Sequence, residues 1–145
     1  MTGSTDGGLD GNTYYGKSDI FLVKYNSSGT KQWTKQLGTS EYELGIDVTS
    51  DSSGNIYVTG FTRGGLDGNT SSGESDIFLI KYNSSGTKQW TKQLGTSSYD
   101  SGFGVTTDTS GNIYITGQTK GGLDGNTNSG KRDIFLIKFN SSGTK

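Results

Sequence analysis

Hydrophobic and polar positions along this chain recur with a period of 57 residues. The apolar run Ile20–Tyr25 returns twice, each time 57 residues further on. Residues 19–75 and 76–132 align without a gap and are identical at 43 of 57 positions. Self-similarity at a fixed period is the signature of a repeat architecture. The chain divides into a partial repeat, two full repeats and a second partial repeat: 1–18, 19–75, 76–132 and 133–145.

Each repeat contains four short segments with the pattern of strands, separated by turns that contain glycine. The segment Ile20–Tyr25 is apolar at nearly every position, which is typical of a strand covered on both faces. Lys31–Leu37 is polar and carries lysines, as expected of an exposed edge strand. Gly45–Ser50 is rich in glycine, which indicates a close approach of neighbouring backbones. The fourth strand is Asn55–Thr62, and a 14-residue loop, 63–76, follows it.

Four antiparallel strands per repeat describe the blade of a β-propeller, so we predict an all-β fold with about 2.5 blades per chain. A β-solenoid is the alternative, but its coils are usually shorter and tight antiparallel turns such as Asp51–Gly54 fit it less well. Neither terminal blade is complete, which would leave apolar faces in water. We therefore expect a homo-oligomer of two, three or four chains to complete the ring. The other possibility is a fragment of a longer array.

Composition narrows the range of functions. The chain has 25 glycines, no proline, cysteine or histidine, and a net charge of −1. Only 27% of residues are hydrophobic and the mean hydropathy is −0.63, but aromatic residues that recur in register argue against disorder. Without a basic cluster we expect no nucleic-acid or membrane partner. Without histidine or cysteine there is little to support catalysis, so we predict that the chain is not an enzyme.

The loop Leu66–Thr70 places an aspartate and an asparagine two positions apart around a glycine. Hard oxygen ligands in this spacing are how Ca²⁺ loops begin, although the bidentate glutamate that would complete such a loop is absent. A turn held by Asx side chains explains the same residues without metal. The candidate calcium ligands are Asp10, Asn12, Asp67, Asn69, Asp124 and Asn126.

Aromatic and acidic residues give the remaining candidates. Tyr42 and Tyr99 precede the glycine-rich strand, and together with Asp47 they are candidates for binding a carbohydrate by stacking and hydrogen bonding. Trp33 and Trp90 recur on the edge strand, and we expect each to pack against the next blade. The other carboxylates near this strand, Glu43 and Asp100 among them, are expected to cap turns or to face solvent.

The run Gly45–Gly60, the loop Gly65–Thr70 and the strand Asp76–Tyr82 together resemble the SBBP family of bacterial β-propeller repeats. The resemblance implies a propeller in which Gly45–Ser50 is innermost and Lys31–Leu37 outermost. It also implies a bacterial protein at the cell surface or outside the cell, of undefined activity. Near-identical repeats suggest recent duplication or deliberate design.

We therefore predict a non-catalytic structural or interaction scaffold that self-assembles into a closed propeller. The alternative is a lectin-like or calcium-dependent binding module that uses one face of the ring.

Overall fold

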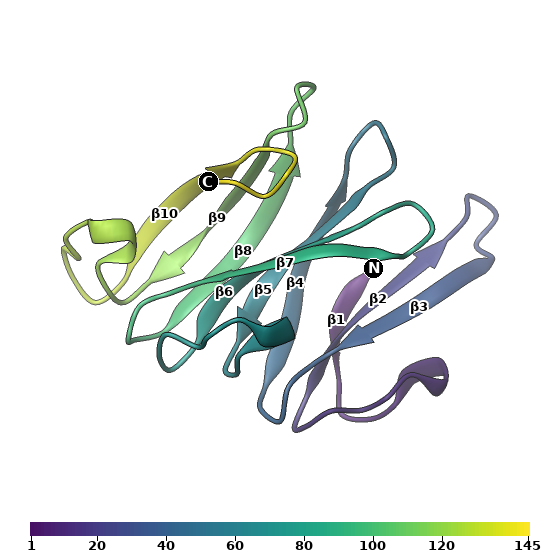
Figure 1. Cartoon of the computed structure of the whole chain (residues 1–145), viewed down its shortest axis with the longest axis horizontal. Coiled ribbons are helices and arrows are strands. Elements are labelled where there is room, and N and C mark those ends of the chain that lie inside the picture. Colours follow the sequence, from purple (N-terminus) through teal and green to yellow (C-terminus); the bar gives the residue numbers. More distant parts are fainter.

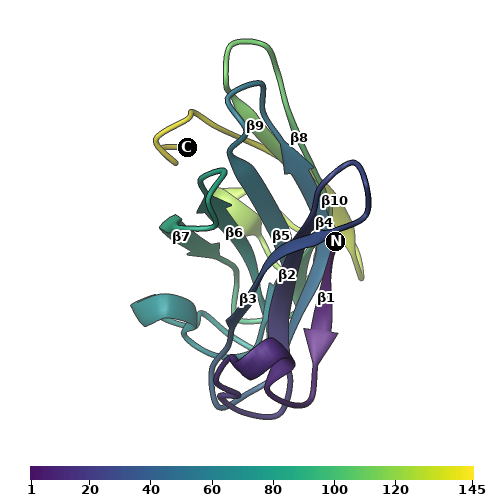
Figure 2. The ribbon, with the colours of Figure 1, turned by 90° about the vertical axis from the view of Figure 1, so that its right-hand side faces the viewer.

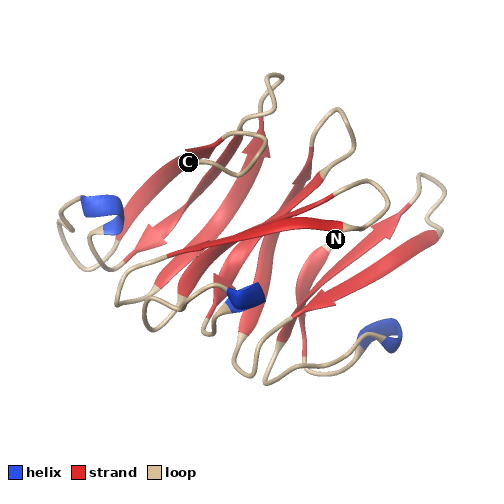
Figure 3. Ribbon diagram, viewed as in Figure 1, coloured by secondary structure: helices blue, strands red, loops and turns tan.

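The computed structural model describes all 145 residues as ten strands joined by turns and three short 3₁₀ turns. In chain order these are β1 (Thr2–Thr5), η1 (Leu9–Gly11), β2 (Asp19–Tyr25), β3 (Lys31–Leu37), β4 (Glu43–Ser50), β5 (Ile56–Thr62), η2 (Leu66–Gly68), β6 (Asp76–Tyr82), β7 (Lys88–Leu94), β8 (Asp100–Thr107), β9 (Ile113–Thr119), η3 (Leu123–Gly125) and β10 (Asp133–Phe139). Strands make up about half of the chain, and the helical turns lie in the loops between them (Figure 3). None of these turns has the length or apolar character to cross a bilayer.

The strands form three antiparallel sheets that lie side by side (Figure 1). Blade 1 is β1-β2-β3, blade 2 is β4-β5-β6-β7, and blade 3 is β8-β9-β10. Blade 2 therefore has all four strands, while blade 1 has no strand in the β4 position and blade 3 none in the β7 position. This order confirms the predicted all-β fold and the predicted sequence of strands. Seen from the side (Figure 2), the blades form an open stack and not a closed ring.

Short turns join neighbouring strands as the sequence predicts. In the turn after β2, the Asn26 Oδ1 atom accepts hydrogen bonds from the backbone N–H of Ser28 at 3.1 Å and of Thr30 at 2.8 Å. Gly29 has a φ of 78°, a left-handed conformation that glycine adopts without a steric cost. The same turn recurs after β6 and after β10.

The first strand of each blade meets its neighbour closely. A Cβ atom on Gly45 of β4 would lie 2.2 Å from the Thr2 Oγ1 atom of β1, and one on Gly102 of β8 would lie 2.3 Å from the Thr59 Oγ1 atom of β5. Only glycine fits at such distances, because no side-chain carbon can be accommodated. The prediction that glycines in this strand mark a close approach of backbones is confirmed.

The hydrophobic core lies between blades and not within them. Two buried clusters fill the two boundaries. Between blades 1 and 2 the cluster comprises Ile20, Leu22, Val58, Leu66, Phe78, Ile80 and Tyr82. Between blades 2 and 3 it comprises Tyr57, Ile77, Leu79, Val105, Ile113, Ile115, Leu123, Ile137 and Phe139.

The two tryptophans of the outer strands complete these boundaries. Trp33 of β3 packs against the first cluster and Trp90 of β7 against the second. A Cβ atom on Gly86, in the turn of the next blade, would lie 2.9 Å from the Trp33 ring. The predicted packing of both tryptophans against the following blade is confirmed.

Several boundaries differ from the prediction. The strand predicted at Gly45–Ser50 begins at Glu43, because Glu43 already pairs with Thr62 at the end of β5. The Glu43 N–H also donates to the carbonyl of Ser18, just before β2 of blade 1, at 2.9 Å, and this contact between blades was not visible in the local pattern. The predicted 14-residue loop ends at Ser75 and contains η2, because Asp76 already pairs with Thr62 as the first residue of β6.

Candidate functional site

A row of alternating cationic and tyrosine side chains runs across the end of the blades that carries the β5–β6 and β7–β8 loops. The Arg63 guanidinium carbon lies 5.5 Å from the centre of the Tyr42 ring and 5.9 Å from that of Tyr99. The Lys17 Nζ atom lies 5.2 Å from the Tyr42 ring centre, and the Lys120 Nζ atom lies 4.5 Å from that of Tyr99. We call these five residues the cation–tyrosine row.

Each contact in the row is within the range in which a cation is attracted to an aromatic face, which stabilises an exposed pair by about 0.5–1 kcal/mol. Tyr42 and Tyr99 are 44% and 37% exposed, so both rings remain accessible to a ligand. Tyr42 and Tyr99 occupy one repeat position and Arg63 and Lys120 another, whereas Lys17 comes from a different position of the first, partial repeat. The sequence indicated the tyrosines but not their cationic partners.

A pocket of about 500 Å³ adjoins the row between β4 and β8. We call it the inner pocket. Its lining residues are Ile46, Phe61, Arg63, Ser75, Tyr99, Ser101, Phe103, Gln118, Lys120 and Arg132. Three of these side chains are cationic and none is acidic. The arrangement is suited to an anion that also offers an apolar or flat surface.

The three residues predicted to bind a carbohydrate do not converge on one place. Tyr99 lines the inner pocket, and Tyr42 holds the equivalent position one repeat earlier in the row. Asp47 lies elsewhere: its Oδ2 atom accepts a hydrogen bond from the Val105 N–H at 2.9 Å. This carboxylate therefore joins the first strands of blades 2 and 3, and the structure gives it no part in the inner pocket.

In each predicted calcium loop the aspartate forms an ion pair with a lysine. Asp67 adopts a left-handed conformation with a φ of 56°, and its carboxylate pairs with the Lys88 ammonium of the neighbouring strand. Burial is the largest influence on the pKa of Asp67 and raises it, but the hydrogen bonds from Lys88 and Thr91 and the charge of Lys88 together hold that pKa below its ordinary value. The Asn69 Nδ2 atom donates to the Leu66 carbonyl at 2.8 Å, so its side chain serves the turn.

The same pairing occurs in the other two loops, at Asp10 with Lys31 and at Asp124 with Lys145. No three His, Cys, Asp or Glu side chains lie close enough together to hold a metal ion. Calcium binding by these loops stays a prediction. The lysines were missed because each lies 21 residues from its aspartate, beyond the strand that follows the aspartate's loop.

Buried carboxylates occur where blades meet. Asp76 is fully buried, and its Oδ2 atom accepts hydrogen bonds from the Gln93 Nε2 atom at 2.8 Å and the Ser72 N–H at 2.7 Å. Glu43 and Asp100 are also buried and accept hydrogen bonds from the turns before them. The expectation that these two cap turns is confirmed, and the alternative that they face solvent is wrong because the preceding blade covers them.

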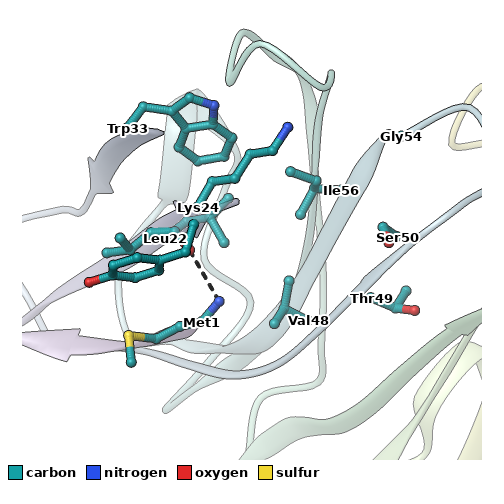
Figure 4. A pocket seen from close by; sticks show the side chains of 11 residues that line it. Met1, Leu22, Lys24, Trp33, Val48, Thr49, Ser50, Gly54 and Ile56 are labelled. Atoms are coloured by element: carbon teal, nitrogen blue, oxygen red, sulfur yellow. Dashed lines mark hydrogen bonds between the residues drawn. The ribbon is translucent and has the colours of Figure 1, made fainter. Parts of the chain in front are cut away.

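The largest hollow, of about 620 Å³, lies between blades 1 and 2 (Figure 4). Met1 lies at its edge, where its amino group donates to the Val23 carbonyl at 3.2 Å. Trp33 and Ile56 line it from opposite blades. At the next boundary the equivalent space holds the buried Tyr57 ring, whose centre is 6.2 Å from that of Trp90. The hollow therefore corresponds to a core position that a tyrosine ring fills at the next boundary.

Comparison with known proteins identifies the repeat. The family model SBBP, described as a beta-propeller repeat, matches residues 32–67 and 89–124. The chain contains two SBBP β-propeller repeats. Each match runs from the outer strand of one blade through the first two strands of the next, so an SBBP repeat spans a blade boundary.

Two larger proteins are similar to this SBBP chain. It is 30% identical over 154 residues to the Regulatory protein FlaEY of Caulobacter vibrioides, a match that covers 99% of the chain and 16% of the relative. It is 29% identical over 151 residues to an Uncharacterized WD repeat-containing protein, L264, of Acanthamoeba polyphaga mimivirus, covering 92% of the chain and 11% of the relative. The chain thus spans less than a fifth of the length of either protein.

Proposed function

We propose that this SBBP chain is a non-catalytic interaction scaffold that self-assembles into a closed β-propeller through its two end faces. The face of blade 3 that points away from blade 2 carries Ile134 and Leu136. The face of blade 1 that points away from blade 2 carries Phe21, Val23 and Tyr25. The proposal is that the blade 3 face of one chain packs on the blade 1 face of another.

The exposure of Ile134 and Leu136 carries the proposal. These side chains are 91% and 73% exposed, whereas Ile77 and Leu79, at the same positions of blade 2, are fully buried. The reason is that blade 3 covers Ile77 and Leu79, while no blade covers Ile134 and Leu136. Apolar side chains gathered on one exposed face mark an interaction surface.

The opposite end face has the complementary residues. Phe21, Val23 and Tyr25 of blade 1 correspond to Phe78, Ile80 and Tyr82, which pack in the boundary with blade 1. Tyr25 is 47% exposed and Tyr82 only 5%. The two end faces therefore carry the central-strand residues of a boundary that the chain already contains twice, although blade 1 lacks the innermost strand and blade 3 the outermost one, and this correspondence is why a second copy is the fitting partner.

A polar contact accompanies each internal boundary. The Lys24 Nζ atom donates to the Ser84 carbonyl in the turn of the next blade at 2.8 Å, and the Lys81 Nζ atom donates to the Ser141 carbonyl at 3.0 Å. Lys138 holds the same position in blade 3 and is exposed. A further chain would offer it the turn after β2, with the same geometry.

The free energies of burial and association favour a closed ring of chains over two chains joined by a single contact. Burying one isoleucine or leucine side chain contributes about 1.5–3 kcal/mol, whereas association costs about 4–15 kcal/mol in lost freedom of motion. Two side chains are not sufficient, so the whole face must be buried. A head-to-tail contact of this kind produces a ring when the rotation between copies closes, and closure adds a second contact without a further loss of freedom.

The relatives support a scaffold role in general terms. One is named a regulatory protein and the other a WD repeat-containing protein, and repeats of the latter kind form propellers.

Light scattering after size exclusion, over a dilution series, tests the proposal. We expect discrete particles of two, three or four chains, and smaller particles for the double variant Ile134→Lys/Leu136→Lys. The matched control, Thr87→Lys/Gln89→Lys, adds the same charge in the exposed turn and outer strand of blade 2 and should behave as the original chain. A monomer with a cooperative melt at every concentration, or an unchanged mass for the end-face variant, would contradict the proposal.

A further inference from the structure

We propose that the inner pocket binds an acidic carbohydrate, that is, a sugar ring that carries a carboxylate. The inference goes beyond the scaffold role and is independent of it, because every lining residue comes from one chain and the pocket is complete between blades 2 and 3. Four observations carry the inference: charge, an unsatisfied hydroxyl, the shape of the lining, and the distribution of differences between repeats.

The positive charge of the pocket is uncompensated. Arg63, Lys120 and Arg132 line it, and none of the three takes part in any of the four ion pairs of the structure. Arg132 donates from its Nη1 atom to the Gln118 Oε1 atom at 3.1 Å, which holds its guanidinium at the pocket. Since the chain as a whole has a net charge of −1, this concentration of cations is local. A carboxylate would meet charge-assisted donors there.

The Ser101 hydroxyl is the second observation. Ser101 lines the pocket and is only 9% exposed, yet its Oγ atom has no hydrogen-bond partner within the protein. A buried polar group without a partner costs about 1–3 kcal/mol, so such a group in a native fold calls for an explanation. A hydroxyl or carboxylate oxygen of a ligand in the pocket supplies the missing partner.

The lining combines flat apolar surfaces with hydrogen-bonding groups. Tyr99 and Phe103 are 37% and 47% exposed, and Phe61 lines the opposite side from blade 2. Aromatic faces stack on the apolar side of a sugar ring, while Ser75 and Gln118 can hydrogen-bond its hydroxyls. The volume of about 500 Å³ lies within the range of small-molecule sites.

The differences between repeats are enriched at this pocket. The two full repeats differ at 14 of 57 positions, whereas the ten lining residues occupy six repeat positions, of which five differ and only that of Tyr99 is constant. Exposure alone does not explain this, because the turn and outer strand of residues 26–40 and their counterparts 83–97 are identical. The turn and outer strand are thus identical in the two repeats, whereas most residues that line the pocket differ between them.

The equivalent place at the other blade boundary is unlike the inner pocket. Asp6 stands where the inner pocket has Arg63, and Leu44 stands where it has Ser101. An acidic residue replaces a cation and an apolar side chain replaces the unsatisfied hydroxyl. We therefore expect one site per chain, between blades 2 and 3.

Calorimetric titration with trigalacturonate at low ionic strength tests the inference, with neutral galactotriose as the control ligand. Two variants introduce the residue that the other repeat has at the same position: Ser101→Leu and Arg132→Ser. Each removes a charge-assisted or buried hydrogen bond, so we expect about a tenfold loss of affinity or more. Lys131→Gln is the matched control, because Lys131 is exposed next to Arg132 but does not line the pocket.

The expected result is binding of trigalacturonate that weakens with added salt, no binding of galactotriose, and an unchanged affinity in the Lys131→Gln variant. Absence of binding at millimolar trigalacturonate, equal binding of the neutral sugar, or equal losses in Lys131→Gln and Arg132→Ser would overturn the inference. Repeating the titration with Ile134→Lys/Leu136→Lys separates it from self-assembly, because the pocket should bind equally well when the end faces cannot pack.

Discussion

Ile77 and Ile134 are the same residue at the same position of two repeats, in opposite environments. Ile77 is fully buried against blade 3, and Ile134 is 91% exposed. Substitution of Ile77 by alanine removes three carbon atoms from the core, which costs about 2.4 kcal/mol at ~0.8 kcal/mol per methylene. The cavity left behind raises the total to about 3–5 kcal/mol. Ile134→Ala should change the stability of a single chain by less than about 0.5 kcal/mol.

Urea denaturation followed by tryptophan fluorescence measures both variants, first at the lowest usable protein concentration. The loss for Ile77→Ala should be the same at every concentration, because its partners belong to the same chain. The loss for Ile134→Ala should be near zero in dilute solution and grow with concentration, because any partner belongs to another chain and assembly stabilises the folded state by mass action.

Equal losses for the two variants in dilute solution would refute this reasoning, since they would mean that blade 3 does not cover Ile77 as the structure shows. A loss for Ile134→Ala that does not change with concentration would instead place its partner within the same chain. Either result would require a different arrangement of the blades.

Three further substitutions test other parts of the structure. Asp76→Ala removes the acceptor of the Ser72 N–H and one of the acceptors of the Gln93 amide, which keeps the Gly64 carbonyl, and we expect a loss of about 1–3 kcal/mol in urea denaturation, with a smaller loss for Asp76→Asn. Hydrogen bonds, first that from the Asn112 side chain, lower the pKa of Asp108 from 3.8 to about 2; stability present above pH 3.8 should therefore fall as the pH drops toward 2, and the urea midpoint of Asp108→Ala should depend less on pH in that window. Gly102→Ala would place its Cβ atom 2.3 Å from a threonine hydroxyl and should destabilise by about 1–3 kcal/mol, whereas thermal denaturation of Gly130→Ala, which meets no atom within 4 Å, should show little change.

The strand order and the turns could be predicted because their signals are local and recur. Asn26 and Gly29 define a turn within four residues, and the absence of a side chain at Gly45 indicates that a neighbouring strand lies close to it. The burial of Glu43 could not be predicted, because its hydrogen-bond partner Ser18 belongs to another blade, 25 residues earlier in the chain. The partner of Asp67 was missed for the same reason, since local patterns do not show which strand will lie beside a loop.

The sequence does contain an indication of the inner pocket, namely the differences between the two repeats, but it can be interpreted only when the strand order is known. Ser101, Gln118 and Arg132 are far apart in the chain, and each merely differs from its counterpart in the other repeat. Once β8, β9 and the start of β10 are placed side by side, these differences fall around one hollow. Variation among near-identical repeats is therefore informative about a site when it is read on the fold.

The glycines of the innermost strands also determine curvature. At the inner edge β1 and β4 approach until no side-chain carbon fits at Gly45, while at the outer edge the Trp33 ring lies between its own blade and the turn at Gly86. Each blade boundary is thus a wedge, narrow inside and wide outside. The number of blades that complete a full turn follows from this wedge angle, so a methyl group added at Gly45 or Gly102 would flatten the curve and favour a wider ring.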